Sequence, residues 1–126
     1  MLVVGSVVAG TLLATAPAQA AEAAAKCPDR WICLYEHQDG RGGSISFPEG
    51  SPGSDDLSKV PCPTCEGGGT FANRLSSFIN NTSQTWWAFY ETHGRGERHN
   101  MNPTGNRVLN LLLSDEDKVS SIYSWR

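Results

Sequence analysis

Four cysteines are the residues of this chain with the most reactive side chains, and they fall into two local pairs. Cys27 and Cys33 form the first pair, and Cys62 and Cys65 form the second. An even number of cysteines in a small chain is typical of disulfides in an oxidising compartment. Four cysteines allow three pairings, and we favour the two local ones because each pair is close in sequence. The first disulfide would fix the N-terminal segment to a strand, and the second would close a very small loop.

Zinc binding is the alternative chemistry for the second pair. Cys62 and Cys65, together with His93 and His99, are residue types that bind zinc, and the spacing of the two histidines is acceptable. His37 and His93 lie in polar turns, where an exposed histidine is ordinary. The sequence contains neither a Gly-x-Ser-x-Gly elbow nor a His-Glu-x-x-His motif, and its acidic residues are scattered across turns. We therefore expect no enzymatic activity.

The N-terminal segment favours disulfides over zinc, because it predicts export. Residues 1–16 are apolar and uncharged, and Ala18-Gln19-Ala20 matches the A-x-A pattern of a signal-peptide cleavage site. We expect a signal peptide over residues 1–20, a flexible leader over 21–26 and a secreted domain over 27–126. A transmembrane anchor is the alternative, but polar residues and a proline interrupt an already short apolar run.

The net charge of −3 argues against some partners of that domain. Nucleic acids and anionic membranes both require a basic surface, so we expect neither to bind once the signal peptide has been removed.

A duplicated turn organises the predicted domain. The pattern Tyr-Glu followed by Gly-Arg-Gly occurs within residues 35–42 and again within 90–96, where the glycines are offset by 54 positions. A polar-x-x-Ser-Ser turn also occurs twice, within residues 73–77 and 117–121, at an offset of only 44. The first half therefore contains about ten additional residues between these two features. Cys62 and Cys65 lie in that interval.

Short strands separated by turn residues predict an all-β fold. Residues 31–35, 43–47 and 85–90 are β-prone, and the segment 80–83 is typical of a hairpin connection. Four short strands per half predict two Greek-key motifs that pack as a sandwich. The first motif is expected over about 27–82 and the second over about 83–126.

The repeated residues resemble the βγ-crystallin superfamily, whose signature is aromatic-x4-aromatic-x-Gly followed by a serine that packs onto the folded turn. The matching residues are Tyr35, Gly42 and Ser77 in the first half, and Phe89, Tyr90, Gly96 and Ser121 in the second. Gly40 replaces the second aromatic residue of the first copy. The resemblance implies a βγ-crystallin-like sandwich of two Greek-key motifs.

Two segments resemble a narrower group, the Streptomyces metalloproteinase inhibitor family of secreted bacterial peptidase inhibitors. These segments are Cys27-Pro28 through Cys33-Leu34-Tyr35-Glu36, and residues 71–82. The resemblance implies that the chain binds an extracellular protease and inhibits it, with thermolysin-type metalloproteases as the target class. We expect the inhibitor to be a monomer.

The additional residues around the second cysteine pair are the candidate inhibitory loop. An inhibitor must present a surface loop that binds like a substrate but stays rigid, because rigidity lowers the ordering entropy lost on binding. Prolines and a short disulfide would provide that rigidity, and Val60 or Thr64 could occupy a pocket of the protease while Glu66 approaches its catalytic metal. The alternative is a braced loop without contacts to a protease. The candidate residues are Val60, Pro61, Pro63, Thr64 and Glu66.

The Ser-Ser turns are candidate calcium sites, because the same turn binds calcium in some βγ-crystallins. The candidate ligands are Asn73, Ser76, Asp117 and Ser120. The first position of the motif is Ala72 in one copy and Glu116 in the other, so one site has lost a ligand. Calcium prefers carboxylates, and we expect no required cofactor and at most one weak Ca²⁺ site. Without metal, Asn73 and Asp117 would cap their turns.

Two further functions follow from other residues. A calcium-stabilised structural or stress module is the first alternative to inhibition. The second is a secreted toxin or cell-wall-binding protein that uses an exposed tryptophan. Alternation along a strand places one of Trp86 and Trp87 in the core and the other outside, and Trp31 could join the outer one.

Overall fold

The computed structural model describes residues 26–124, and the predicted signal peptide lies outside them. This part of the chain contains strands and short 3-10 turns but no α-helix. The strands are β1 (Trp31–His37), β2 (Arg41–Pro48), β3 (Gly53–Ser54), β4 (Ser77–Asn80), β5 (Trp86–Phe89), β6 (Arg98–Met101), β7 (Leu109–Asn110) and β8 (Ser121–Tyr123). The 3-10 turns are η2 (Gln38–Gly40), η3 (Leu57–Lys59) and η4 (Thr92–Gly94).

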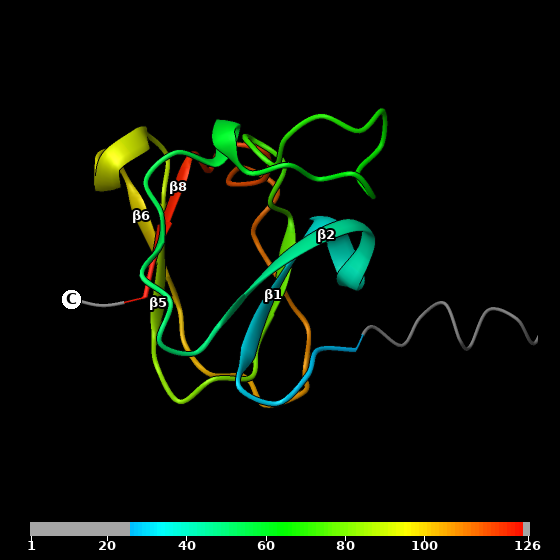
Figure 1. Ribbon diagram of the computed structural model, residues 1–126, viewed down its shortest axis with the longest axis vertical. Helices are drawn as coiled ribbons and strands as arrows, with labels where there is room; N and C mark the ends of the chain where they lie inside the picture. The colour runs from blue at the N-terminus through cyan, green and yellow to red at the C-terminus, as the bar shows by residue number, and fades with distance from the viewer. Residues whose placement is uncertain (1–25, 125–126) are drawn as a thin grey trace, which may run out of the picture.

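The strands form two four-stranded antiparallel sheets that pack face to face (Figure 1). The strand orders are β2-β1-β4-β7 and β3-β8-β5-β6. Each half of the chain contributes three of its four strands to one sheet and the remaining strand to the other. The strands that change sheets are β3 of the first half and β7 of the second. The predicted all-β sandwich is therefore confirmed, and the two halves share one core.

The segment between β4 and β5 is not the hairpin that its turn residues predict. The two strands belong to different sheets, so the chain crosses from one layer to the other at this point. The Asn80 side chain stabilises the crossing by donating hydrogen bonds to the carbonyl oxygens of Gln84 (2.8 Å) and Met101 (2.7 Å). The hairpin prediction was wrong because an Asn-rich turn specifies a change of direction but not which strand will become the neighbour.

The core lies between the sheets and is built by the inward positions of the central strands. Ile32 and Leu34 of β1 and Trp86 and Ala88 of β5 are fully buried. The rings of Phe47 and Trp86 stack with their centroids 5.9 Å apart. These inward positions alternate with outward ones along β5, as the pleat of a strand requires.

The duplicated turns η2 and η4 fold in the same way. Asp39 in η2 and His93 in η4 both adopt left-handed backbone angles, with φ of 61° and 59°. A glycine follows each of them, also at positive φ, because two successive left-handed residues are costly with a side chain on both. His93 is therefore a turn residue, equivalent to Asp39.

The two signature serines lock these turns from the neighbouring strands. The Ser77 hydroxyl donates to the carbonyl of His37 (2.6 Å) and accepts from the Gly40 N–H (2.9 Å). The Ser121 hydroxyl makes the same pair of bonds to Glu91 (2.6 Å) and Gly94 (3.1 Å). Each turn is therefore held by one buried side chain.

Replacing Ser77 with alanine is expected to lower the free energy of unfolding by about 2 kcal/mol, because a partly buried carbonyl and an N–H lose their partner. We expect a similar loss for Ser121→Ala, measured by urea denaturation. Ser46→Ala is the control, because Ser46 is exposed on β2 and should change stability by less than about 0.5 kcal/mol. Losses at Ser77 and Ser121 as small as that of the control would contradict the locking role.

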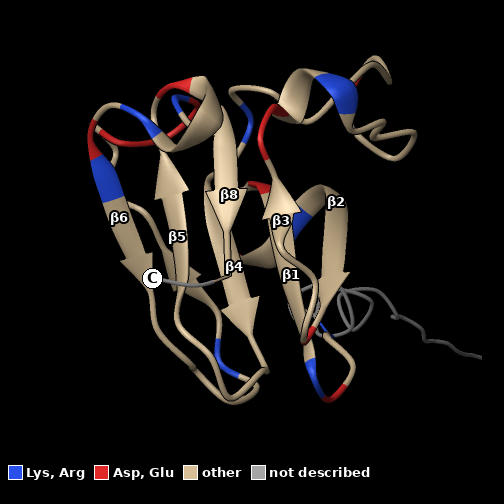
Figure 2. Cartoon of the chain, turned by 60° about the vertical axis from the view of Figure 1, so that its left-hand side comes forward, with Lys and Arg blue, Asp and Glu red and all other residues tan. Residues whose placement is uncertain are grey.

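Charged residues gather in the loops at the two ends of the strands (Figure 2). The strands themselves are mostly uncharged in this view. In the part of the chain that the structure describes, no helix has the length and apolar character needed to cross a membrane.

Candidate functional site

The additional residues of the first half form a small hairpin-like excursion, which we call the braced loop (residues 60–71). Its two ends are joined by hydrogen bonds from the Phe71 N–H to the Val60 carbonyl (3.0 Å) and from the Cys62 N–H to the Gly69 carbonyl (2.8 Å). It projects from the end of the sandwich near the start of β2 (Figure 1).

Both local disulfides are formed. Cys62 and Cys65 close the tip of the braced loop, and Cys27 and Cys33 join the segment before β1 to that strand. The zinc alternative is therefore wrong, because the two thiolates that would bind the ion are joined to each other. The Cys65 N–H donates to the Cys62 carbonyl (3.0 Å), so the disulfide encloses a tight turn.

The braced loop sits directly on the first residues of β2. A side chain at Gly43 would place its Cβ 2.3 Å from the backbone nitrogen of Cys65, well inside contact distance. The next residue, Ser44, donates its N–H to the Thr64 hydroxyl (3.0 Å). At the offset of the duplicated turn, the residue equivalent to Gly43 is Glu97. At this position a glycine is present in the half that carries the loop, and a glutamate is present in the half that lacks it.

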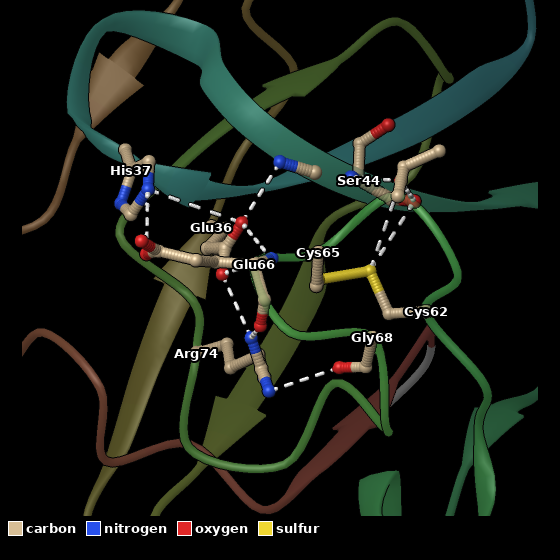
Figure 3. Close-up of a disulfide and its surroundings, with 10 residues drawn as sticks. Glu36, His37, Ser44, Cys62, Cys65, Glu66, Gly68 and Arg74 are labelled. Atoms are coloured by element: carbon tan, nitrogen blue, oxygen red, sulfur yellow. Dashed lines mark hydrogen bonds and ion pairs between the residues drawn. A yellow bond between two sulfur atoms is a disulfide. The ribbon is translucent and has the colours of Figure 1, made fainter.

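An ion pair between a buried carboxylate and a partly buried guanidinium fixes the other side of the braced loop, and we call it the Glu36–Arg74 clamp (Figure 3). The Glu36 carboxylate accepts the N–H groups of Gly43 (2.9 Å) and Glu66 (2.9 Å) and a hydrogen bond from the Arg74 guanidinium (2.7 Å). The guanidinium also donates to the carbonyls of Glu66 (2.9 Å) and Gly68 (3.0 Å). The Glu36 side chain is only 7% exposed.

These contacts determine the charge state of Glu36. Burial alone raises the pKa of a carboxyl group, but hydrogen bonds from the Gly43 and Glu66 backbones and from Arg74 outweigh it. The pKa of Glu36 is lowered overall, so the carboxylate is ionised at neutral pH and the clamp is a charged pair.

Glu36, His37 and Glu66 also form a group that could hold a metal ion, with one ligand atom from each lying within 4.8 Å of the others. The oxygens of Glu36 are already occupied by N–H donors, and the Arg74 guanidinium beside them repels a cation. Glu36 is therefore better suited to forming the clamp than to binding a metal ion.

The five candidate contact residues differ in their exposure. Pro61, Pro63, Thr64 and Glu66 are exposed, and the Glu66 side chain is 82% exposed. Val60 is partly buried and packs against the core, so its side chain does not project toward a protease as we had expected. Its position next to the core follows from the hydrogen bond that ties its carbonyl to Phe71.

The family model of peptidase inhibitor family I36 matches residues 20–102, which include the braced loop and the clamp. The chain belongs to peptidase inhibitor family I36. The match confirms the resemblance to the Streptomyces metalloproteinase inhibitor family. It identifies the chain as a protease inhibitor and not an enzyme. A search of curated proteins finds no match to the chain.

Solved structures similar to this I36 chain are βγ-crystallins. One from Ciona intestinalis has a TM-score of 0.56 at 22% identity, covering 75% of this chain and 98% of its own. One from an archaeon has a TM-score of 0.55 at 15% identity, covering 77% and 99%. One from Clostridium beijerinckii has a TM-score of 0.54 at 15% identity, covering 75% and 95%. At these identities the likeness establishes the fold alone.

The candidate calcium ligands of the I36 chain meet across the two halves. The Ser76 hydroxyl lies 3.4 Å from an Asp117 carboxylate oxygen, and the Ser120 hydroxyl lies 3.5 Å from the Asn73 side-chain oxygen. Burial and the nearby Glu116 charge raise the pKa of Asp117. Glu116 itself accepts a hydrogen bond from Gln38 (2.9 Å). The four predicted ligands lie together, but Asp117 is the one carboxylate among them, and calcium prefers carboxylates.

Asn73 and Asp117 also have a structural role, which links the two halves of the chain. Both adopt left-handed backbone angles, with φ of 59° and 61°. Their N–H groups donate to Val119 (3.0 Å) and Leu75 (3.1 Å), so each turn is tied to the other half of the chain.

His99 and the two adjacent tryptophans contact neighbouring side chains, whereas Trp31 is exposed at the start of β1. His99 contacts the Tyr90 hydroxyl, which donates to Asp115, and that hydrogen bond raises the pKa of Tyr90 to about 12. Trp86 is in the core and Trp87 faces outward, as alternation predicts, but the Arg98 guanidinium lies over the Trp87 ring at 4.4 Å. One face of the outward tryptophan is therefore covered.

Proposed function

We propose that this I36 chain is a secreted monomeric inhibitor of an extracellular thermolysin-type metalloprotease. The observation that carries the proposal is the braced loop, whose tip is exposed while its backbone is held by a disulfide and by the clamp. A loop that is already ordered loses little conformational entropy when a protease binds it. The same restraint opposes the distortion that a scissile peptide bond undergoes during hydrolysis.

The tip of the loop presents a chemically suitable contact surface. Pro63 and Thr64 lie exposed within the disulfide ring, and Glu66 follows it directly. The Glu66 backbone is held on both sides, and its carboxylate is 82% exposed, with the His37 ring 3.9 Å away. A carboxylate is an oxygen ligand for zinc, so this side chain is suited to a cleft that contains a catalytic zinc ion.

The proposal is tested by an inhibition assay with a thermolysin-type enzyme and a subtilisin-type serine protease as the comparison. We expect the purified chain to inhibit the metalloprotease more strongly. In the Cys62→Ser/Cys65→Ser variant we expect a loss of about 100-fold, equivalent to about 2.7 kcal/mol. The matched control is Cys27→Ser/Cys33→Ser, which removes a disulfide outside the braced loop and should alter inhibition far less. Absence of metalloprotease inhibition by the intact chain would overturn the proposal.

Secretion is proposed on two grounds. Residues 1–20 have the pattern of a signal peptide, and both disulfides require an oxidising compartment. Expression of the full chain in a bacterial host should yield exported protein that begins at Ala21. N-terminal sequencing of protein in the medium checks this, and a chain retained in the cell with residues 1–20 intact would contradict it.

Calcium is not expected to be required for this function. Adding 1 mM calcium should raise the melting temperature by no more than about 2–3 °C. The dissociation constant of weak extracellular modules reaches about 1 mM, and a ligand at its dissociation constant stabilises the folded state by only about 0.4 kcal/mol. Calorimetry with calcium and with a chelator provides the measurement. A rise of several degrees that disappears in Asp117→Asn would instead support a calcium-stabilised module.

A further inference from the structure

We propose that Glu36 and Arg74 are positioning residues for inhibition, which hold the C-terminal side of the braced loop in the conformation that the protease binds. This inference rests on the proposed inhibitory function and assigns the clamp a place in it. Neither side chain needs to touch the protease.

The first argument is the set of backbone groups that the clamp holds. Glu36 accepts the N–H of Glu66, and Arg74 donates to the carbonyl of the same residue. Both peptide groups that flank the Glu66 Cα are therefore fixed to one ion pair, whose carboxylate is buried. Arg74 extends the restraint to Gly68 through a second nitrogen. Charge-assisted hydrogen bonds of this kind are about twice as strong as neutral ones.

The second argument is the need for such a restraint at this position. Glu66 is followed by Gly67, Gly68 and Gly69, all with positive φ, and a side chain at Gly67 or Gly68 would meet no atom within 4 Å. Glycines have the largest backbone freedom of any residue. The disulfide ends at Cys65, and backbone hydrogen bonds join Gly68 to Cys65 (2.8 Å) and Gly69 to Cys62 (2.8 Å). The clamp adds the contacts that fix the N–H and the carbonyl of Glu66 itself.

The third argument comes from the second half of the chain, which carries the same scaffold without the loop. Glu91 is equivalent to Glu36, and Lys118 is equivalent to Arg74. In the described part of the chain these two residues form no ion pair with each other. Glu91 is exposed, and the Lys118 ammonium lies over the Tyr90 ring at 5.8 Å. The fold therefore does not need an ion pair at these positions, and one is present only where the braced loop must be held.

The test uses the full secreted chain with Glu36→Gln and Arg74→Met as single and double variants. The controls are Glu91→Gln and Lys118→Met at the equivalent positions. Inhibition of the thermolysin-type enzyme is measured, and mass spectrometry follows cleavage of the chain by that enzyme. Amide hydrogen exchange at Glu66 and Gly68 is measured without protease. Circular dichroism confirms that each variant is folded at the assay temperature.

We expect Glu36→Gln and Arg74→Met each to weaken inhibition about 10-fold, equivalent to about 1.4 kcal/mol, and the double variant to lose little more, because both act through one contact. Cleavage should be faster and confined to residues 60–71, and exchange at Glu66 should be faster. Arg74→Lys keeps the charge but not the forked donor geometry, so we expect it to restore inhibition only in part. The controls should match the wild type.

The outcomes separate this inference from the proposed function. If the wild type inhibits and the folded clamp variants inhibit equally well without faster loop cleavage, the positioning role is wrong and the inhibitory function stands. If the wild type inhibits no metalloprotease, the proposed function fails and the role in inhibition fails with it. Unchanged Glu66 exchange in Glu36→Gln overturns the clamp whatever the inhibition assay gives. General unfolding is recognised because it would produce cleavage throughout the chain.

Discussion

Replacing Gly43 with alanine is expected to displace the braced loop and to reduce protease inhibition about 100-fold, which corresponds to about 2.7 kcal/mol. The added Cβ would lie 2.3 Å from the Cys65 nitrogen and 2.4 Å from the Thr64 carbonyl carbon, and backbone atoms cannot yield as a flexible side chain can. Gly43 is not among the glycines with positive φ, so its own backbone accepts a side chain. The three atoms nearest to that Cβ all belong to the loop, and overpacking of this kind typically costs about 1–3 kcal/mol of stability.

A shortened chain provides the control for this prediction. When residues 61–70 are replaced by two glycines, Gly43→Ala should change the free energy of unfolding by less than about 0.5 kcal/mol, because the clashing atoms are gone. The equivalent residue in the second half, Glu97, already carries a long side chain. Urea denaturation of the four proteins gives the coupling between the two changes. Equal destabilisation in both backgrounds would show that Gly43 is needed by the strand and not by the loop.

Replacing Trp86 with alanine is expected to lower the free energy of unfolding by about 3–5 kcal/mol. Trp86 is fully buried, stacks on Phe47 and donates its indole N–H to the Thr82 hydroxyl (3.1 Å), so the change leaves a large cavity and removes one hydrogen bond. A natural domain is stable by only about 5–15 kcal/mol in total. The variant should therefore be close to its unfolding transition at 25 °C, as measured by urea denaturation monitored by circular dichroism.

The adjacent tryptophan is the control for the core substitution. Trp87 faces outward under Arg98, and its replacement with alanine should cost about 1 kcal/mol, the value of one cation–π contact at the surface. Equal losses for the two tryptophans would contradict the assignment of Trp86 to the core side of β5.

The parts of the fold that depend on local pattern were predictable from the sequence. The duplicated glycine turns and the alternation in β5 are properties of neighbouring residues, and the structure contains both. The ten additional residues were located by comparing offsets between the halves, and they form the braced loop. The local disulfides followed from cysteine spacing.

The contacts that hold the site were not predictable in the same way. Glu36 lies in the duplicated turn and so was interpreted as part of the scaffold, whereas Arg74 lies 38 positions away. Their pairing depends on the three-dimensional path of the loop between them, which no local pattern specifies. The difference between Gly43 and Glu97 was the one signal in the sequence, because a glycine replaces a charged residue where the backbone of the loop comes close.

The exchange of third strands between the sheets has a consequence for the order in which the chain can fold. β1, β2 and β4 need β7 to complete their sheet, and β3 has no partner until β8 inserts between it and β5. A nascent chain therefore cannot complete the first sheet before β7 at residues 109–110, or the second before β8 at residues 121–123. Contacts this distant in sequence make folding slow, so we expect a single late and cooperative folding step. Loss of β8 would leave β3 without a partner strand and β5 with one unpaired edge.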